Sequence, residues 1–406
     1  MKPPSSAPDR PEPPGGARGI YLDHAATSPV CPEAVEAVLR GMEITGNPSS
    51  RHGAGDEAHE ALRSSREQLA RLFGCTADEV VFTGGGSEAD ALAICGTVLA
   101  ARDRTPHVIT TAIEHSAVLE SCGLARELGA QVTLVEPDGR GWVDPEAVRR
   151  ALRPGTVLVS VMHANNETGV VQPVAEIAEL AHQAGALMHT DAVQAAGKIP
   201  LAESGADLIS VSAHKFYGPK GVGALKVAAG VRLAPLIRGG GQERGLRAGT
   251  ENVAGVLGMA AAASAAVRRL ADPGFQDHRH ALRASLLKGL EQAGDLEVNG
   301  DTASCLPEIL NVSFAGLRGD TLVDVLAVRG VCVSAGSACH AGSDAPSHVL
   351  TAMGLPAERA KAAVRFSAGR TTTVDAVTEA AATTVDAVTR LRSLGPAVPP
   401  ATRAKK

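Results

Sequence analysis

Short apolar runs alternate with helical patterns along most of the chain, and this alternation limits the possible folds more than any other feature. Each run has the length of one buried strand, and most of the intervening segments carry apolar residues at helical spacing. Strands separated by helices favour a mainly parallel sheet with helices on both faces. The runs that we interpret as strands are Val80–Thr83, Val108–Ala112, Val132–Val135, Val157–Met162, Leu187–Thr190 and Leu208–Ser212.

The pattern changes after an alanine-rich helix that is predicted near Asn252–Leu270. The next residues, Ala271–Gly274 (ADPG), have the composition of a domain boundary. Beyond them we expect a long helix, further strands and a final helix, which together form a smaller α+β domain. The expected elements are strands at Ile309–Phe314, Gly330–Val333 and Ala363–Ser367 and a helix near Val374–Leu394.

These patterns predict an α/β protein with two domains. The large domain covers residues 19–270, and we expect its N-terminal segment to pack with the small domain at residues 271–394. Residues 1–18 are rich in proline and have little to bury, which predicts a disordered extension. Residues 395–406 are predicted to form a short tail.

Composition excludes several classes of protein. A chain of 406 residues with a net charge of -5 and 2% aromatic residues is a poor candidate for a dedicated nucleic-acid binder. The seven cysteines form no CxxC pair, which argues against a disulfide scaffold or a structural zinc site. No uninterrupted apolar stretch has membrane-spanning length. We therefore expect a soluble, cytoplasmic protein that is kept reduced and binds neither membrane nor nucleic acid.

A glycine-rich turn follows the first predicted strand, in Phe82–Glu88 (FTGGGSE). Glycines bring backbone N–H groups close to an anion, and the N-terminus of the helix that begins at Ser87 adds partial positive charge. A phosphate group fits such a turn. The turn alone is also compatible with a purely structural connection, and it is neither a Walker motif nor a GxGxxG motif.

An acid and a lysine follow two later strands. Asp191 ends the strand in LMHTDAVQ, where α/β folds bind their ligands, and a buried acid there needs a cation or a strong donor. Lys215 follows the next strand, in SVSAHKFYGPK, where desolvation can make its amine a nucleophile. The alternative is a plain salt bridge between the two. With the glycine-rich turn, however, they describe a pyridoxal phosphate site.

Three further features have weaker support from the residues alone. His115 follows a strand, and it could stack on a planar ring or shuttle a proton, although a lone histidine is more often structural. Asn165 and Asn166 end another strand, where turn formation is the simpler explanation. Arg365 lies in VRFS, and it could clamp a carboxylate, although surface arginines are commoner.

Cys339 differs from the other cysteines in its surroundings. It lies in VSAGSACHAG, among small and flexible residues, whereas a buried structural cysteine usually lies among Leu, Ile and Val. The other cysteines lie in or beside helical patterns, in a strand or next to turns. We interpret Cys339 as an accessible thiol on a mobile loop.

Motifs that carry a family resemblance run from about Ile20 to Leu394. They are YLDHAATSP (21–29), GNPSSRHGAG (46–55), EHSAVL (114–119), NNETGVVQP (165–173), HTDAVQAAGK (189–198), SAHKFYGPKG (212–221), GGGQERGLRAGTEN (239–252), SAGSACHAGSDAPSHVL (334–350) and VRFSAGRTTT (364–373). In these segments the chain closely resembles cysteine desulfurases of the NifS/IscS type. Those enzymes form part of the class V aminotransferase branch of fold-type I pyridoxal phosphate enzymes.

The resemblance implies a role for each residue that matches a motif. Lys215 would hold the cofactor as a Schiff base and later move protons. Asp191 would pair with the pyridinium nitrogen, and His115 would stack on the ring and assist proton transfer. The other implied cofactor contacts are Gln194 and Asn166 at the phenolic oxygen, with Gly86, Ser87, Ser212, His214 and the neighbouring subunit's Thr250 at the phosphate.

The resemblance also implies a reaction and partners. Arg365, together with Asn166, would bind the carboxylate of L-cysteine, and Cys339 would attack its sulfur and become a persulfide as L-alanine is released. The protein would be a homodimer that passes sulfur to an iron–sulfur scaffold, a sulfur carrier or a tRNA-thiolation enzyme. No structural metal site is expected, although Cys339 could contact a transferred iron–sulfur cluster.

The chain departs from the family pattern at the phosphate turn, which commonly reads Thr-Ser-Gly-x-Thr-Glu-x-x-Asn. Ser87 keeps the hydroxyl, whereas Gly84 and Ala91 lack the polar side chains. The Cys339 segment shows no shortening, which favours direct delivery of sulfur to partners. A selenocysteine lyase or another class V enzyme remains the alternative, and neither needs Cys339. A non-catalytic sulfur-relay subunit is a third possibility, against which Lys215 argues.

Overall fold

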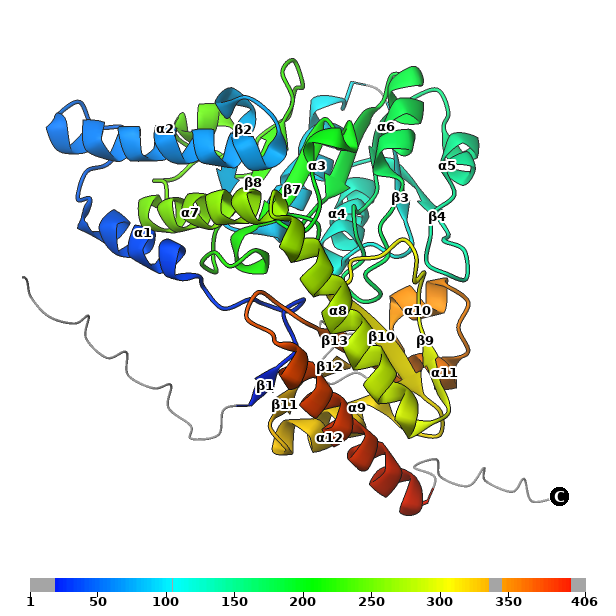
Figure 1. The fold of residues 1–406 in the computed structure, drawn as a ribbon. Helices are drawn as coiled ribbons and strands as arrows, with labels where there is room; N and C mark the ends of the chain where they lie inside the picture. The colour runs from blue at the N-terminus through cyan, green and yellow to red at the C-terminus, as the bar shows by residue number, and fades with distance from the viewer. Residues whose placement is uncertain (1–18, 104, 336–344, 396–406) are drawn as a thin grey trace, which may run out of the picture.

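The computed structural model describes residues 19–103, 105–335 and 345–395 (Figure 1). The predicted N-terminal extension, Cys339 and all but the first residue of the predicted tail lie outside the described residues. The described chain forms two larger sheets of different character, a mixed one near the N-terminal half and an antiparallel one near the C-terminus.

The large sheet has seven strands in the order β2-β8-β7-β6-β5-β3-β4. All pairs from β7 to β4 are parallel, whereas β8 runs antiparallel to both of its neighbours. This confirms the predicted α/β class and the mainly parallel character of the sheet. The strands are β2 (Val80–Thr83), β3 (His107–Thr111), β4 (Gln131–Val135), β5 (Thr156–Ser160), β6 (Leu187–Asp191), β7 (Leu208–Ser212) and β8 (Gly223–Val227).

The strand β8 is the one member of the large sheet that the sequence pattern does not indicate. It follows β7 through a short turn rather than a helix, so the alternation of strand and helix does not mark it. Its first residue, Gly223, packs against the glycine-rich turn, since a Cβ atom there would lie 2.6 Å from the carbonyl carbon of Gly85. β8 therefore supports the turn that begins α3.

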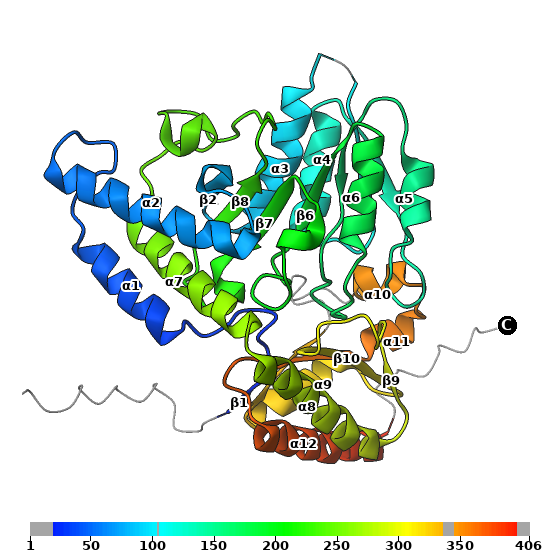
Figure 2. The same cartoon turned by 45° about the horizontal axis from the view of Figure 1, so that its top comes forward.

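Helices cover both faces of the large sheet (Figures 1 and 2). One face packs against α2, α5, α6 and α7 around a large hydrophobic core, and the other packs against α3 and α4. The helices are α1 (Pro32–Glu43), α2 (Gly53–Phe73), α3 (Gly86–Ala100), α4 (Ser116–Glu127), α5 (Pro145–Ala151), α6 (Val174–Gln183) and α7 (Val253–Leu270).

Among the described residues, α7 is the one helix long and apolar enough to cross a membrane by length and composition. It lies against α1 and α2, and residues such as Met259 and Ala263 are fully buried there. The same composition is expected of a core helix in a protein with an alanine-rich interior, and that is how α7 packs.

The C-terminal part is built around a four-stranded antiparallel sheet in the order β12-β13-β10-β9. Its core packs against α8, α9 and α12, which lie away from the large sheet in Figure 2. The elements are α8 (Pro273–Leu290), β9 (Leu296–Val298), β10 (Ile309–Phe314), α9 (Gly319–Val328), β11 (Val331–Cys332), β12 (Ser334–Ala335), α10 (His348–Ala352), α11 (Ala357–Lys361), β13 (Ala363–Ser367) and α12 (Val374–Ser393).

The N-terminal segment joins the two parts of the molecule. Its strand β1 (Ile20–Tyr21) pairs with β11, and Leu22 is buried in the core of the small domain. The segment then crosses to the large domain, where the Ser28 hydroxyl donates to the backbone oxygen of His214 at 2.7 Å. Backbone atoms of this crossing consequently lie beside the carboxyl ends of the large sheet's strands.

Candidate active site

A cavity of about 280 Å³ lies at the carboxyl ends of the large sheet's strands, between the large sheet and β13. The turns after β2, β3, β5, β6 and β7 all reach it. Ten residues predicted from the sequence line it: Gly86, Ser87, His115, Asn166, Asp191, Gln194, Ser212, His214, Lys215 and Arg365. The cavity therefore lies where α/β folds bind their ligands, outside the carboxyl ends of the strands.

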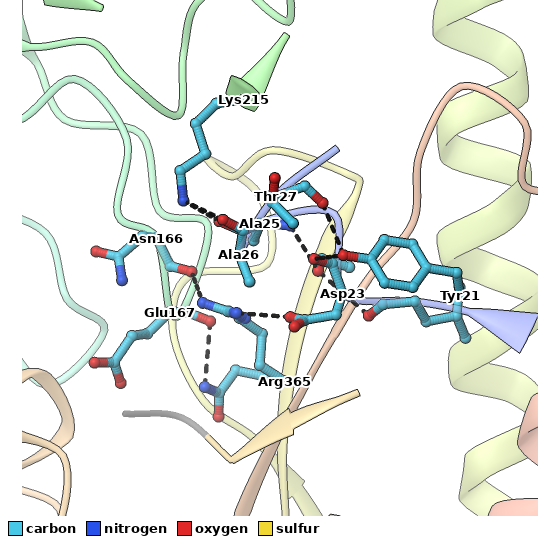
Figure 3. A network of polar contacts seen from close by, with 12 residues as sticks. Tyr21, Asp23, Ala25, Ala26, Thr27, Asn166, Glu167, Lys215 and Arg365 are labelled. Carbon is cyan, nitrogen blue, oxygen red and sulfur yellow. Dashed lines mark hydrogen bonds and ion pairs between the residues drawn. The ribbon is translucent and has the colours of Figure 1, made fainter. Parts of the chain in front are cut away.

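Lys215 lies in a short 3-10 turn (Ala213–Lys215) directly after β7. Its Nζ donates to the backbone oxygens of Ala25 at 2.7 Å and Ala26 at 2.8 Å (Figure 3). After Lys215 the chain turns sharply, because Tyr217 has a left-handed φ of 72° and donates its N–H to Ser28 Oγ at 2.8 Å. The crossing segment thus fixes both the amine and the turn that carries it.

Asp191 ends β6 and is only 5% exposed. Its Oδ1 accepts a hydrogen bond from the backbone N–H of Val193 at 2.9 Å. Burial raises the pKa of Asp191, against the opposing effects of His115 and Lys215. Asp90 is buried beside it, and burial together with the Asp191 charge raises the pKa of Asp90 well above its usual range. The positive groups of the cavity, His115 and Lys215, thus favour the charged form of Asp191, whereas burial and the Asp191 charge favour the protonated form of Asp90.

The helix α3 begins at the cavity with Gly86 and Ser87. A side chain at Gly86 would place its Cβ 2.8 Å from Val193 Cγ2, so glycine permits this close approach of the turn after β6. His214 lies at the same cavity, and burial plus the positive charges of Lys215 and Lys220 lowers the pKa of His214 to about 4. The His214 ring is therefore neutral at neutral pH. The partial positive charge at this end of the cavity comes from the backbone N–H groups at the N-terminus of α3.

Three polar side chains of the cavity come from other turns. His115 caps α4, and its Nδ1 accepts from the backbone N–H of Ala117 at 3.1 Å, so Nε2 carries the proton in the neutral ring. Gln194 is buried and donates its Nε2 to the Ala25 oxygen at 2.9 Å. Asn166 is half-buried in the turn after β5. All are within a cavity that also holds Lys215.

Arg365 comes from the small domain, on β13, and is only 2% exposed. One guanidinium nitrogen lies 2.9 Å from Asp23 Oδ1, and another donates to the backbone oxygen of Asn166 at 2.9 Å (Figure 3). Its Nε is buried with no hydrogen-bond partner among the described residues. A buried guanidinium with an unused donor can bind a carboxylate, provided that Asp23 gives up its contact with one guanidinium nitrogen.

Sequence comparison assigns the chain to a family. The family model for class V aminotransferases matches residues 20–379. The chain belongs to the class V aminotransferase family. This confirms the resemblance inferred from the motifs and, with it, the fold-type I architecture. The cysteine desulfurases of this family depend on pyridoxal phosphate.

Several known proteins are similar to this chain over most of its length. A cysteine desulfurase IscS from Dictyoglomus turgidum is 42% identical over 383 residues, which are 93% of this chain and 97% of that protein. A solved NifS-like protein superposes with a TM-score of 0.85 at 36% identity and covers 93% of this chain and 100% of that one. A solved complex of SspA with cysteine superposes with a TM-score of 0.75 at 35% identity, over 86% of this chain and 98% of that one.

Two residues that the class V resemblance implies are not brought to the cavity by the described structure. Thr250 is exposed in the loop before α7 and is not among the lining residues, as fits a residue expected to serve the neighbouring subunit. Cys339 lies outside the described residues, between β12 and α10. Within the part of the chain that is described, no cluster of three His, Cys, Asp or Glu side chains is arranged to hold a metal ion.

The sequence analysis missed several class V residues that shape the cavity. Asp23 lies in the quoted motif YLDHAATSP, but its partner Arg365 is 342 positions away. Glu114, next to His115, is fully buried, and its Oε1 accepts from Thr111 Oγ1 at 2.7 Å and from the backbone N–H of Met162 at 2.9 Å. Glu167 is likewise buried, and it accepts from Ser347 Oγ. All three acids lie in motifs quoted above, but only the tertiary contacts show which partners they bind.

The buried acid Glu114 makes folding stability depend on pH. Burial, and to a smaller degree the Asp191 charge, raises the pKa of Glu114 to about 8 from 4.5. Its contribution is fully present below the unfolded pKa of 4.5 and is lost as pH rises through about 8. Glu114→Gln is therefore expected to be less destabilised by that pH increase, by a difference on the order of a few kcal/mol.

Thermal unfolding midpoints measured between pH 5 and 9 would check this expectation. The matched control is Glu120→Gln, an exposed acid on helix α4, which begins two residues after Glu114; this variant should retain the pH dependence of the parent. A Glu114→Gln curve that runs parallel to the parent's over the whole range would show that Glu114 is not the group responsible.

Proposed function

We propose that the protein is a cysteine desulfurase that binds pyridoxal phosphate in the cavity, converts L-cysteine to L-alanine and transfers the sulfur to Cys339. The observation that carries this proposal is the lysine amine of Lys215 in one cavity with the buried acid Asp191. The cysteine desulfurases among the relatives support the choice of reaction within the family.

The residues present fit pyridoxal phosphate at both ends. Asp191 is a buried carboxylate that faces the cavity, and a protonated pyridine nitrogen would supply the cation that stabilises its charge. At the other end, the N-terminus of α3 with Ser87 and Ser212 offers donors for a phosphate group. Gly86 leaves the space that this approach requires.

When bound, the cofactor supplies an electron sink for the electrons of a bond broken at the substrate's Cα or Cβ. Lys215 then holds and returns a proton at its Nζ. When that amine is not bonded to the cofactor, it donates to the backbone oxygens of Ala25 and Ala26. His115 lies close enough to Asp191 to lower the pKa of that acid, so protonation of His115 and ionisation of Asp191 favour each other.

Arg365 is proposed to bind the carboxylate of L-cysteine. Its guanidinium is held from two sides, by Asp23 and by the Asn166 backbone, and this fixes the plane of the fork. Burial strengthens the ion pair that a substrate carboxylate would form. Because Asp23 already neutralises part of the Arg365 charge, Arg365 is not an isolated buried cation when no substrate is bound.

The sulfur-accepting thiol is proposed to be Cys339, and the described cysteines support this by their positions. Cys95 and Cys122 are buried, and burial raises the pKa of Cys122 to about 12. None of the cysteines in the described ranges lines the cofactor cavity. Ser334, five positions before Cys339 in the sequence, pairs with Arg365 on β13, so the last described residues before Cys339 lie beside the proposed carboxylate-binding residue.

The attack on sulfur keeps its atoms and electrons in balance. The Cys339 thiolate forms an S–S bond as the C–S bond of the substrate breaks, and the carbon fragment keeps the electron pair and is protonated to alanine. A dithiol reductant or an acceptor protein then takes the terminal sulfur. The acceptor is proposed to be an iron–sulfur scaffold, a sulfur carrier or a thiolation enzyme in the cytoplasm. The active form is proposed to be a homodimer in which Thr250 completes the neighbouring site.

The experiment that tests this function measures alanine and sulfide formed from L-cysteine by the purified protein with a dithiol reductant. Equal amounts of both products are expected, and the protein should be yellow with bound cofactor. A coloured protein that releases alanine only from L-selenocysteine would identify a selenocysteine lyase. A colourless protein that binds no pyridoxal phosphate would overturn the proposal as a whole.

A further inference from the structure

A half-buried lysine that the sequence analysis did not single out, Lys198, lies next to the cofactor cavity. Lys198 is in the turn after β6, and its Nζ donates to the backbone oxygen of Gln194 at 2.8 Å and to Gln194 Oε1 at 3.3 Å. Gln194 in turn donates its Nε2 to the Ala25 oxygen at 2.9 Å. The same oxygen accepts from Lys215 at 2.7 Å. A chain of polar contacts therefore runs from Lys198 to Lys215.

The two neighbours of Gln194 each permit a single orientation of its amide. An ammonium group has donors and no acceptor, so Lys198 must face the amide oxygen. A backbone carbonyl has acceptors and no donor, so Ala25 must face the amide nitrogen. A flipped amide would bring donor against donor and acceptor against acceptor. The second N–H of Gln194 is then left for an acceptor inside the cavity that Gln194 lines.

The charges around Lys198 come from several elements. Glu308, just before β10, favours its ammonium form, whereas Lys215 and Arg279 of α8 disfavour it. Burial is the largest effect, and with these charges it lowers the pKa of Lys198 to about 8. Arg279 is paired with Glu308 and also donates to the Lys198 backbone oxygen at 2.8 Å. The turn that carries Lys198 is consequently anchored to the small domain's helix α8.

We propose that Lys198 is a positioning residue that acts through Gln194: its ammonium fixes the amide so that an N–H points at an anionic oxygen of the bound cofactor. This inference rests on the proposed function only in that a cofactor with such an oxygen binds in the cavity. Lys198 also places a positive charge near Lys215, which disfavours a proton on the Lys215 nitrogen.

The test compares holoenzymes of the parent, Lys198→Met and Lys198→Arg, with pyridoxal phosphate as the probe and no substrate. Lys198→Met removes the charge and both hydrogen bonds, and we expect about tenfold weaker cofactor binding. The pH midpoint of the change in visible absorption should rise by about one unit, because a proton on the Lys215 nitrogen is no longer opposed. Lys198→Arg should keep both values close to the parent's, since a second cavity of about 360 Å³ beside Lys198 has room for the larger cation.

A double-mutant cycle with Gln194→Ala separates action through Gln194 from a general loss of packing. If Lys198 acts through the amide, Lys198→Met should weaken cofactor binding little further once Gln194→Ala is present. Multiplied effects of the two changes would overturn the proposal. An unchanged pH midpoint in Lys198→Met, or an equal loss in Lys198→Arg, would overturn it as well.

Two additional proteins complete the design. Lys226→Met is the matched control, because Lys226 is also partly buried and donates to a backbone oxygen, that of Ala206 at 2.7 Å, and is not among the cavity-lining residues. It should bind the cofactor as the parent does. If Lys198→Met fails to fold, Lys198→Gln gives the same reading, since it too removes the charge. None of these readouts uses L-cysteine, so a parent that binds cofactor without making alanine would contradict the proposed reaction and leave the role of Lys198 standing.

Discussion

Replacing Lys215 with alanine is expected to lower the rate of alanine formation from L-cysteine by about 10⁴-fold or more. The variant loses the nucleophilic amine that would hold the cofactor and the group that would move protons at Nζ. Lys198, the other half-buried lysine nearby, cannot take over, because Gln194 holds its ammonium on the far side of the amide. The bound cofactor should therefore lose the visible absorption that depends on its bond to lysine.

The matched control for this change is Lys220→Ala. Lys220 is an exposed lysine of the same motif, SAHKFYGPKG, and does not line the cavity. It should retain parental activity and absorption. Alanine formation by Lys215→Ala above about 1% of the parental rate would show that the cavity does not use this amine. Activity regained with an added small primary amine would instead confirm that the missing group is the amine itself.

The sheet was predictable because its inner strands are buried on both faces. Such strands are continuous apolar runs, and the inner strand Leu208–Ser212 has the predicted bounds. The edge strand Val80–Thr83 also has them, because all four of its residues are buried, while others shift by one or two residues. β8 was missed because it follows β7 without a helix and begins with Gly223. Gly223 has a low strand propensity, but a larger residue would collide with Gly85. The packing of β8 against the glycine-rich turn therefore decides the residue at this position.

The site was predictable where chemistry depends on strand ends. Lys215 and Asp191 follow adjacent parallel strands, β7 and β6, and adjacency along the chain gives adjacency in space. Contacts between distant segments carry no such signal. The pair of Asp23 with Arg365 and the backbone oxygens of Ala25 and Ala26 depend on the crossing of the N-terminal segment.

Sequence reasoning also cannot separate a half-buried lysine from an exposed one when both lie in turns. Lys198 and Lys220 each follow a glycine or a proline in a loop after a strand. Only the folded structure shows that Lys198 is half-buried, next to Arg279 and Glu308, whereas Lys220 faces solvent. The distinction decides which of the two can orient a side chain of the cavity.

Cys339→Ala is expected to reduce both alanine and sulfide formation by about 10³-fold or more, while cofactor binding and visible absorption stay at parental values. The reason is that none of the cysteines in the described ranges lines the cavity proposed to bind the cofactor, so removal of the thiol should leave that cavity intact.

The control is Cys332→Ala, because Cys332 on β11 is the exposed cysteine of the described chain and lies shortly before Cys339. Mass spectrometry after a brief exposure to L-cysteine should find one added sulfur on Cys339 in the parent and in Cys332→Ala. If Cys339→Ala makes alanine and sulfide as fast as the parent, no persulfide forms there, and direct elimination of the sulfur, as in a lyase, becomes the mechanism. Loss of activity together with loss of bound cofactor would instead assign Cys339 a role in holding the cavity together.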